Sequence, residues 1–166
     1  PAAYRRLALS TVNTHDLPPT AGYLYGEHIA LRDRLGLLTR DTETENSEDL
    51  AWQNRILARI GEYGLFDGTA LDGHDFDGAA RDDRGDITDL LVAMHRYIAG
   101  TPSALTCASL VDMVGDIKAQ NQPGTTHDLY PNWCIPLCDA TNTPILIHDL
   151  PALPLFRAVA EASRRR

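Results

Sequence analysis

Ser10-Thr11-Val12-Asn13-Thr14-His15-Asp16-Leu17-Pro18-Pro19-Thr20 is the stretch that decides the fold. It continues an apolar run that begins at Leu7, and this run predicts a short strand. His15 and Asp16 follow the strand, and two prolines then prevent it from continuing. A strand that ends in an imidazole and a carboxylate is typical of the carboxyl face of an α/β barrel, where catalytic groups gather. We therefore expect the functional centre at this strand end.

Helical patterns and one further apolar run follow this stretch. In the first half of the chain we expect a helix over 20–38 capped by Thr20, a polar loop over 39–48, and a helix capped by Ser47 that ends near Gly64. A solvated acidic loop over 67–86 is expected next, followed by a helix capped by Asp86 that ends at Gly100. The second half is expected to contain a strand over 104–110, a turn or short helix over 111–115, a long loop over 120–133, a short extension over 144–148 and a final helix over 151–165. Helices between two apolar runs predict a parallel βαβ unit, so the fold class is α/β.

Composition limits the classes of function. The chain has 166 residues, enough for one domain spanning 1–166, and 43% hydrophobic residues are enough for a packed core. Its net charge of −8 argues against binding to nucleic acid or to an anionic membrane, since both need clustered cations. The basic run 164–166 is too short to reverse this balance. No nucleic-acid or membrane partner is therefore expected.

Three cysteines indicate a reducing compartment. An odd, low count of thiols favours a cytoplasmic protein over a disulfide scaffold. No apolar run has the length of a membrane-spanning helix, and no signal peptide is recognisable. Cys134 and Cys138 lack zinc-site spacing, and the aspartates of the acidic loop lack the alternation of a calcium loop. No metal site is expected from these patterns.

The His15-Asp16 pair allows three interpretations on its own. It can bind a sugar or act in general acid–base chemistry at the strand end. It can form the metal-binding pair of a phosphohydrolase, which sits on helices and is disfavoured by the prolines that follow. It can also be a capping aspartate beside a surface histidine.

A second polar loop spans Asn121 to Trp133. Amides, a carboxylate and aromatic rings in a loop shaped by proline and glycine are typical of a carbohydrate site, where polar groups bind hydroxyls and rings stack on sugar faces. The alternative is an ordinary loop in which Tyr130 and Trp133 fill the core.

Together, the blocks 13–23, 121–125 and 130–133 resemble the carboxyl-terminal part of bacterial 4-α-glucanotransferases, also called amylomaltases or disproportionating enzymes. The resemblance covers nearly the whole chain. It implies an elaborated (β/α)8 TIM barrel, with the strand before His15 as strand seven and the run 104–110 as strand eight. It also implies transfer of α-1,4-glucan segments by a retaining double displacement, with no cofactor and no essential metal.

Site residues follow from the same resemblance. Asp16 matches the catalytic aspartate that stabilises the transition state at subsite −1. The nucleophile and the acid–base residue lie upstream in the family, so this chain lacks both and is expected to be inactive alone. The substrate-binding positions are His15, Asn121, Pro123, Gly124, Tyr130, Asn132 and Trp133. Two departures from the family pattern are Cys134-Ile135-Pro136, where basic residues are usual, and His127-Asp128, where an acidic residue is usual.

The chain is therefore expected to be a carboxyl-terminal fragment of the catalytic barrel, helix-rich when isolated. Its expected partners are a maltooligosaccharide or starch-derived glucan, and either the missing amino-terminal part of the enzyme or a second copy of the chain. The alternative function is a non-catalytic glucan-binding or interaction module.

Overall fold

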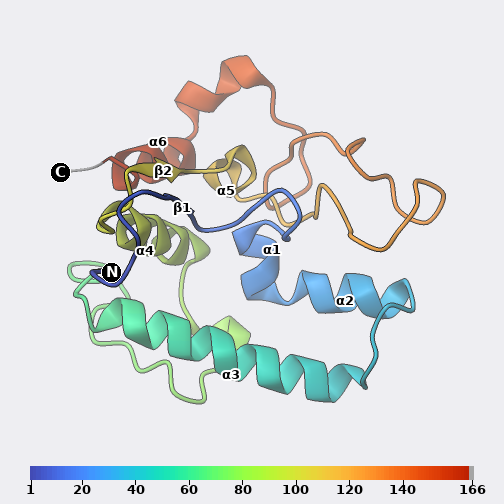
Figure 1. The fold of residues 1–166 in the computed structure, drawn as a ribbon, viewed down its shortest axis with the longest axis horizontal. Helices are drawn as coiled ribbons and strands as arrows, with labels where there is room; N and C mark the ends of the chain where they lie inside the picture. The colour runs from blue at the N-terminus through green and yellow to red at the C-terminus, as the bar shows by residue number, and fades with distance from the viewer. Residues whose placement is uncertain (165–166) are drawn as a thin grey trace.

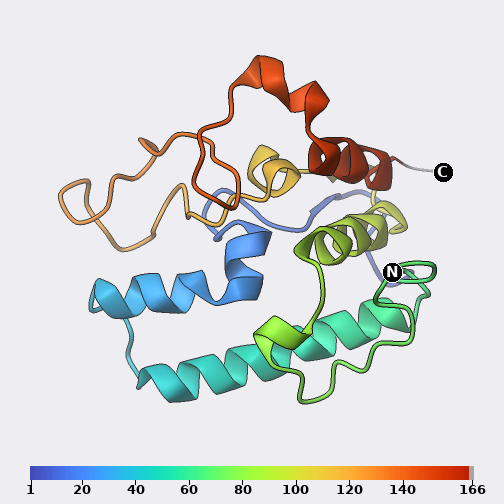
Figure 2. The same ribbon diagram turned by 180° about the vertical axis from the view of Figure 1, so that it is seen from behind.

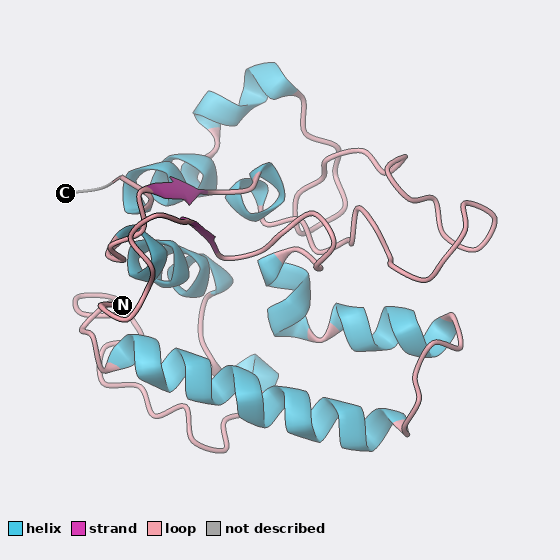
Figure 3. Ribbon diagram, in the orientation of Figure 1, coloured by secondary structure: helices cyan, strands magenta, loops and turns pink. Residues whose placement is uncertain are grey.

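A short parallel sheet joins two strands that are far apart in the sequence (Figure 3). The computed structural model describes residues 1–164. In chain order its elements are β1 (Leu9–Thr11), α1 (Thr20–Tyr25), α2 (Glu27–Arg34), α3 (Thr42–Gly61), the 3₁₀ helix η1 (Arg81–Asp83), α4 (Ile87–Ala99), β2 (Leu105–Cys107), α5 (Leu110–Val114), the 3₁₀ helix η2 (Ile147–Ala152) and α6 (Pro154–Ala162). β1 pairs with β2 in parallel, with Leu9 opposite Leu105, as the predicted βαβ unit requires.

Two apolar clusters hold the helices around this sheet. Figures 1 and 2 show the long α3 on one side of the molecule, while α4 and α6 pack together beside the sheet. One cluster joins α3 to α4 and contains Leu57, Ile60 and Leu90. The other joins α1, α4, α5 and α6 through Ala21, Leu91, Met113 and Val159. The second cluster includes Ala21 of α1, the helix that directly follows the turn carrying His15 and Asp16.

The predicted helix over 20–38 is two shorter helices. Gly26 lies between α1 and α2 with a φ of 81°, a left-handed conformation that only glycine adopts readily, and α2 ends at Arg34. The prediction that Thr20 caps the helix is wrong. Pro19 occupies the cap position, and Thr20 is the first helical residue.

The prediction of a polar loop over 39–48 is also wrong, because α3 begins at Thr42. Asp41 caps this helix by accepting hydrogen bonds from the Thr44 backbone N–H and from Thr44 Oγ1, both at 2.8 Å. Ser47 is not the cap. It lies inside the helix and donates to the Thr44 carbonyl. The first residues of α3 are polar, and none of them is buried, which is why the segment resembles a loop in sequence.

Residues 67–86 contain only the short helix η1, but the prediction of a solvated segment is wrong in part. Leu71 and Phe76 are buried against α3 and α4, and Arg84 is 2% exposed. The aspartates between them remain on the surface. The segment therefore covers the core on the side away from the sheet.

The other elements agree with the predictions apart from their bounds, except that the predicted extension over 144–148 is wrong. Asp86 caps α4 through the Thr88 N–H, and Gly100 ends it. The extension over 144–148 is reduced to a bridge between Pro144 and Cys138, followed by η2. The final helix is α6, and position 165 of its predicted range lies outside the described residues. Within residues 1–164, no helix is both long and apolar enough to cross a membrane.

Candidate functional site

The turn between β1 and α1 presents His15 and Asp16 to solvent. Their side chains are 72% and 55% exposed, and His15 Nε2 lies 3.3 Å from Asp16 Oδ2. The Leu17 N–H donates to the Thr14 carbonyl, and this bond closes the turn. Asp16 does not cap α1, whose N-cap residue is Pro19, and the pair lies on a turn and not on a helix. Asp16 is therefore not a helix cap, although His15 is a surface histidine, and the pair does not sit on a helix as the phosphohydrolase interpretation requires.

Asn121 brings the second polar loop to this turn. Its Nδ2 donates to Asp16 Oδ1 at 2.8 Å. The Trp133 ring lies 5.7 Å from the His15 ring between centroids, with the planes tilted by 42°. Trp133 is 58% exposed and has a φ of 63°, so it does not fill the core as the alternative interpretation required. The two sequence blocks therefore meet at Asp16.

Internal bonds give the second loop its shape. Asn132 accepts from the Gln122 N–H at 2.7 Å and donates to Thr125 Oγ1 at 2.9 Å. The Tyr130 hydroxyl donates to the Ala119 carbonyl at 2.5 Å. Tyr130 and Asn132 thus hold the loop together from within, although both were predicted as substrate contacts. The positive φ of Gly124, 85°, lets the chain turn beside Pro123.

A groove of about 650 Å³ runs from Asp16 along α1 and α2. Asp16, Asn121 and Pro123 line one part of it, and Tyr23 and His28 line another. A neighbouring hollow of about 380 Å³ is lined by His15 and Trp133. Five of the predicted site residues therefore border open space, namely His15, Asp16, Asn121, Pro123 and Trp133. The other three, Gly124, Tyr130 and Asn132, line neither hollow.

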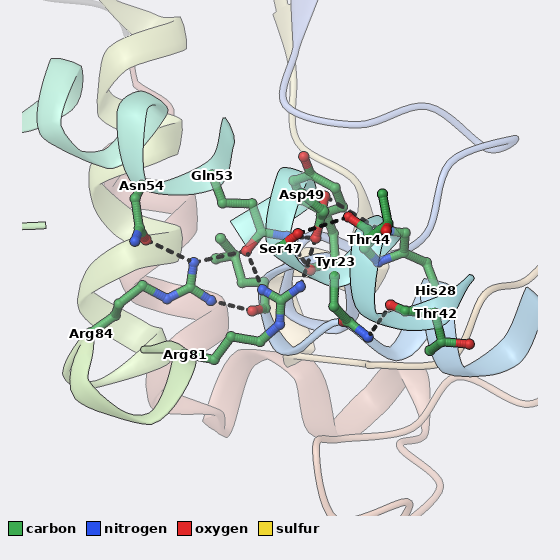
Figure 4. A network of polar contacts seen from close by, with 12 residues as sticks. Tyr23, His28, Thr42, Thr44, Ser47, Asp49, Gln53, Asn54, Arg81 and Arg84 are labelled. Atoms are coloured by element: carbon green, nitrogen blue, oxygen red, sulfur yellow. Dashed lines mark hydrogen bonds and ion pairs between the residues drawn. The ribbon is translucent and has the colours of Figure 1, made fainter. Parts of the chain in front are cut away.

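A polar network that the sequence did not indicate lies behind the groove and reaches it through Tyr23 and His28 (Figure 4). Asp49 accepts hydrogen bonds from Gln53 at 2.7 Å and from Arg81 at 2.8 Å, and its other oxygen lies 3.5 Å from His28 Nε2. Burial, reinforced by the negative charge of Asp49, raises the pKa of Tyr23 to about 12. Tyr23 is therefore a neutral hydroxyl at physiological pH.

Arg84 extends this network into the interior. It donates to Gln53 Oε1 at 2.8 Å and to the Leu24 carbonyl at the end of α1. Burial, with the neighbouring charge of Arg81, lowers the pKa of Arg84 to about 10. The sequence carries a signal of this network. Arg81 and Arg84 stand in an otherwise acidic segment, and the amides Gln53 and Asn54 stand among the apolar positions of a predicted helix.

Asp112 is a second buried group that sequence reasoning missed. It lies on α5 and is 0% exposed. Its Oδ1 accepts from Asn13 Nδ2 and from the Thr20 N–H, both at 2.8 Å, and its Oδ2 accepts from the Thr20 hydroxyl at 2.7 Å. Burial raises the pKa of Asp112, while these hydrogen bonds act in the opposite direction.

His95 on α4 lies beneath this carboxylate. It is 2% exposed, and its Nε2 lies 3.7 Å from Asp112 Oδ2. Its Nδ1 lies 2.8 Å from the Leu91 carbonyl, which can only accept, so Nδ1 carries a proton.

Close backbone contact fixes the two site loops relative to each other. A Cβ on Gly22 in α1 would lie 2.2 Å from the carbonyl oxygen of Ile117. Ile117 precedes the segment that leads to Asn121. Only glycine lets α1 approach this segment so closely, and Gly22 therefore helps to place Asn121 beside Asp16.

Comparisons with known proteins agree on one family. A family model described as 4-alpha-glucanotransferase matches residues 1–141. The chain is 41% identical over 161 residues to the 4-alpha-glucanotransferases of Mycobacterium tuberculosis H37Rv and Mycobacterium bovis, a match that covers 97% of this chain and 20% of theirs. A crystal structure of amylomaltase from Corynebacterium glutamicum matches with a TM-score of 0.93 and 54% identity, over 99% of this chain and 23% of that one. The chain spans about a fifth of the length of the curated relatives it matches.

Proposed function

The chain belongs to the 4-alpha-glucanotransferase family, and from this premise we propose that it forms part of the donor-sugar site of an enzyme that transfers α-1,4-glucan segments between maltodextrins. The observation that carries the proposal is the contact of Asp16 with Asn121 at the mouth of a groove. A solvent-accessible carboxylate held by an amide, beside an exposed aromatic ring, is suited to bind sugar hydroxyls. The substrate class is a maltooligosaccharide or starch-derived glucan.

Asp16 has the role of transition-state stabiliser in this proposal. In a retaining transfer the sugar ring flattens and gains positive charge as the glycosidic bond breaks. Hydrogen bonds from ring hydroxyls to a carboxylate strengthen as this charge develops, so they lower the barrier. His15 and Trp133 border the adjacent hollow and supply a polar edge and a stacking face. Asn121 orients the Asp16 carboxylate and reaches the sugar beside it.

The nucleophile and the acid–base residue come from another part of the enzyme in this proposal. β1 and β2 are strands seven and eight of a (β/α)8 barrel, and the other strands complete the sheet. Leu7, Leu9 and Leu105 support this assignment, since they lie on or beside the sheet and are 93%, 57% and 61% exposed. Apolar side chains on an incomplete sheet need a covering partner. Light scattering that shows the isolated chain as a monomer with no exposed apolar patch would contradict this.

The free thiols fit a cytoplasmic enzyme. Cys107, Cys134 and Cys138 are all unpaired. We place the enzyme in a reducing compartment on this basis.

The decisive experiment substitutes Asp16 in the complete enzyme. Asp16→Asn should lower the turnover of maltotriose disproportionation by at least about a hundredfold, because the amide cannot match the charge of the carboxylate. The matched control is Asp149→Asn. His148-Asp149 is a second exposed pair, with 3.6 Å between the ring nitrogen and the carboxylate, but it lies far along the chain on η2. Normal turnover in Asp16→Asn, or an equal loss in both variants, would refute the role of Asp16.

The isolated chain separates the proposal from the alternative of a non-catalytic glucan-binding module. It should show no disproportionation of maltotriose, because the proposal places two of the reacting carboxylates elsewhere. Robust turnover by the chain alone would show that this division of the site is wrong. Tight binding of maltoheptaose without a catalytic partner would favour the module.

A further inference from the structure

One buried carboxylate holds both ends of the turn that carries His15 and Asp16. Asn13 precedes the turn and Thr20 follows it, and both donate to Asp112. The three bonds are 2.7–2.8 Å long, and all three residues are at most 6% exposed. Asp112 thus joins the two ends of the loop: Asn13, which lies just before the exposed tip, and Thr20, which is the first residue of α1.

The tip of this loop has little support of its own. Residues 14–17 are exposed, and among the described residues their backbone contributes one internal hydrogen bond, from Leu17 to Thr14. Pro18 and Pro19 limit the backbone conformations available on the α1 side. The position of the Asp16 carboxylate is therefore set by the two anchored ends and by the contact with Asn121.

Packing of α5 makes Asp112 a rigid anchor. α5 packs against α6, and its Met113 belongs to the apolar cluster that also contains Ala21 of α1. His95 lies below the carboxylate on α4, and no Lys or Arg takes part in the recorded bonds to Asp112. A buried carboxylate that accepts three hydrogen bonds is costly to displace, because each donor would lose its partner.

We propose that Asp112 is a positioning residue for the glucan-transfer reaction: through Asn13 and Thr20 it sets the position of the Asp16 carboxylate against the transition state. This inference rests on the proposed function of Asp16. Asp112 itself does not touch substrate, because it is fully buried. Loss of one anchor shifts the tip of the turn, and a catalytic group displaced by about 1 Å can cost a hundredfold in rate.

Thr20→Val in the complete enzyme tests the proposal, because valine keeps the shape of threonine and removes the donor to Asp112 Oδ2. The matched control is Thr101→Val. Thr101 is also buried, and its hydroxyl lies 3.1 Å from the Ser10 hydroxyl in β1, so it tethers the strand that precedes the turn. Thr20→Val should lower kcat for maltotriose about tenfold or more while KM stays within about twofold. Thr101→Val should lower the melting temperature but leave kcat near that of the unchanged enzyme.

Asn13→Ala removes the other side-chain anchor and serves if Thr20→Val does not fold. Rates are compared per folded molecule, measured by circular dichroism. A variant that folds and loses only melting temperature, with kcat unchanged, would overturn the proposal, because a structural role alone would then explain Asp112.

A double variant separates this inference from the proposed function. If Asp112 acts through Asp16, Thr20→Val should cause no further loss of kcat in the Asp16→Asn background. A full additional loss there would overturn the positioning role while leaving the role of Asp16 intact. Normal activity of Asp16→Asn alone would instead refute the proposed function.

Discussion

Gly22→Ala is predicted to damage both stability and activity. The added Cβ would lie 2.2 Å from the Ile117 carbonyl oxygen and 2.9 Å from its carbonyl carbon. Ordinary contact begins at 3.4 Å, so α1 and the 117–121 segment must separate by about 1 Å to relieve the overlap. Both colliding atoms belong to the backbone, so a side-chain rotation cannot relieve the overlap.

Two opposing effects decide the size of the change. Alanine favours a helix over glycine by about 1 kcal/mol. Overpacking of a tight core contact costs about 1–3 kcal/mol, and this backbone collision belongs at the upper end of that range. We therefore expect a net loss of about 1–2 kcal/mol in the free energy of unfolding.

Urea unfolding and maltotriose turnover of the complete enzyme measure both consequences. Turnover should fall because the same separation moves Asn121 away from Asp16. Gly61→Ala is the control, since Gly61 is also helical but its Cβ would meet only a Phe66 carbon at 3.7 Å. That variant should be as stable as the unchanged protein or more stable. If Gly22→Ala behaves like Gly61→Ala, the contact with Ile117 does not position the loop.

Two further predictions concern a helix cap and a buried acid. Asp41→Ala should lower the melting temperature because α3 loses its cap, whereas Ser47→Ala should have little effect; the reverse order would contradict the observed start of α3. Burial raises the pKa of Asp112. Just above about pH 3.9 the Asp112 carboxyl is therefore still protonated in the folded state, whereas it is already ionised in the unfolded chain. Stability should therefore fall as pH rises from that value through the raised pKa, and Asp112→Asn should remove this part of the pH dependence in urea unfolding. An unchanged dependence would show that Asp112 does not titrate in this way.

The sequence predicted those parts of the fold that depend on local pattern. The apolar runs before His15 and around Thr106, with helices between them, were sufficient for a parallel pair of strands. Asp86 and Gly100 marked the ends of α4 correctly. The start of α3 was missed because both Asp41 and Ser47 are good caps, and local preference does not choose between them. The break at Gly26 was missed because Leu31, Leu35 and Leu38 beyond it keep a helical spacing.

The candidate site could be predicted where its residues lie next to turns that proline or glycine makes recognisable in the sequence. Asp16 and Asn121 were expected to converge, and they are joined by a hydrogen bond. Tyr130 and Asn132 were chosen for their chemistry; in the structure they form bonds within the loop, and their contact with substrate stays a prediction. Asp112 escaped prediction because its partners are more than ninety residues away, and no local pattern marks such a contact.

The most direct test of the central claim compares transition-state with ground-state binding at Asp16. In the complete enzyme, Asp16→Asn should lower kcat for maltotriose by about a hundredfold or more, while the Kd for maltoheptaose changes less than about fivefold. That difference is expected because positive charge on the sugar ring develops in the transition state and not in the bound ground state. A Kd that weakens as much as kcat falls would mean that Asp16 merely binds glucan, and the proposed role would be wrong.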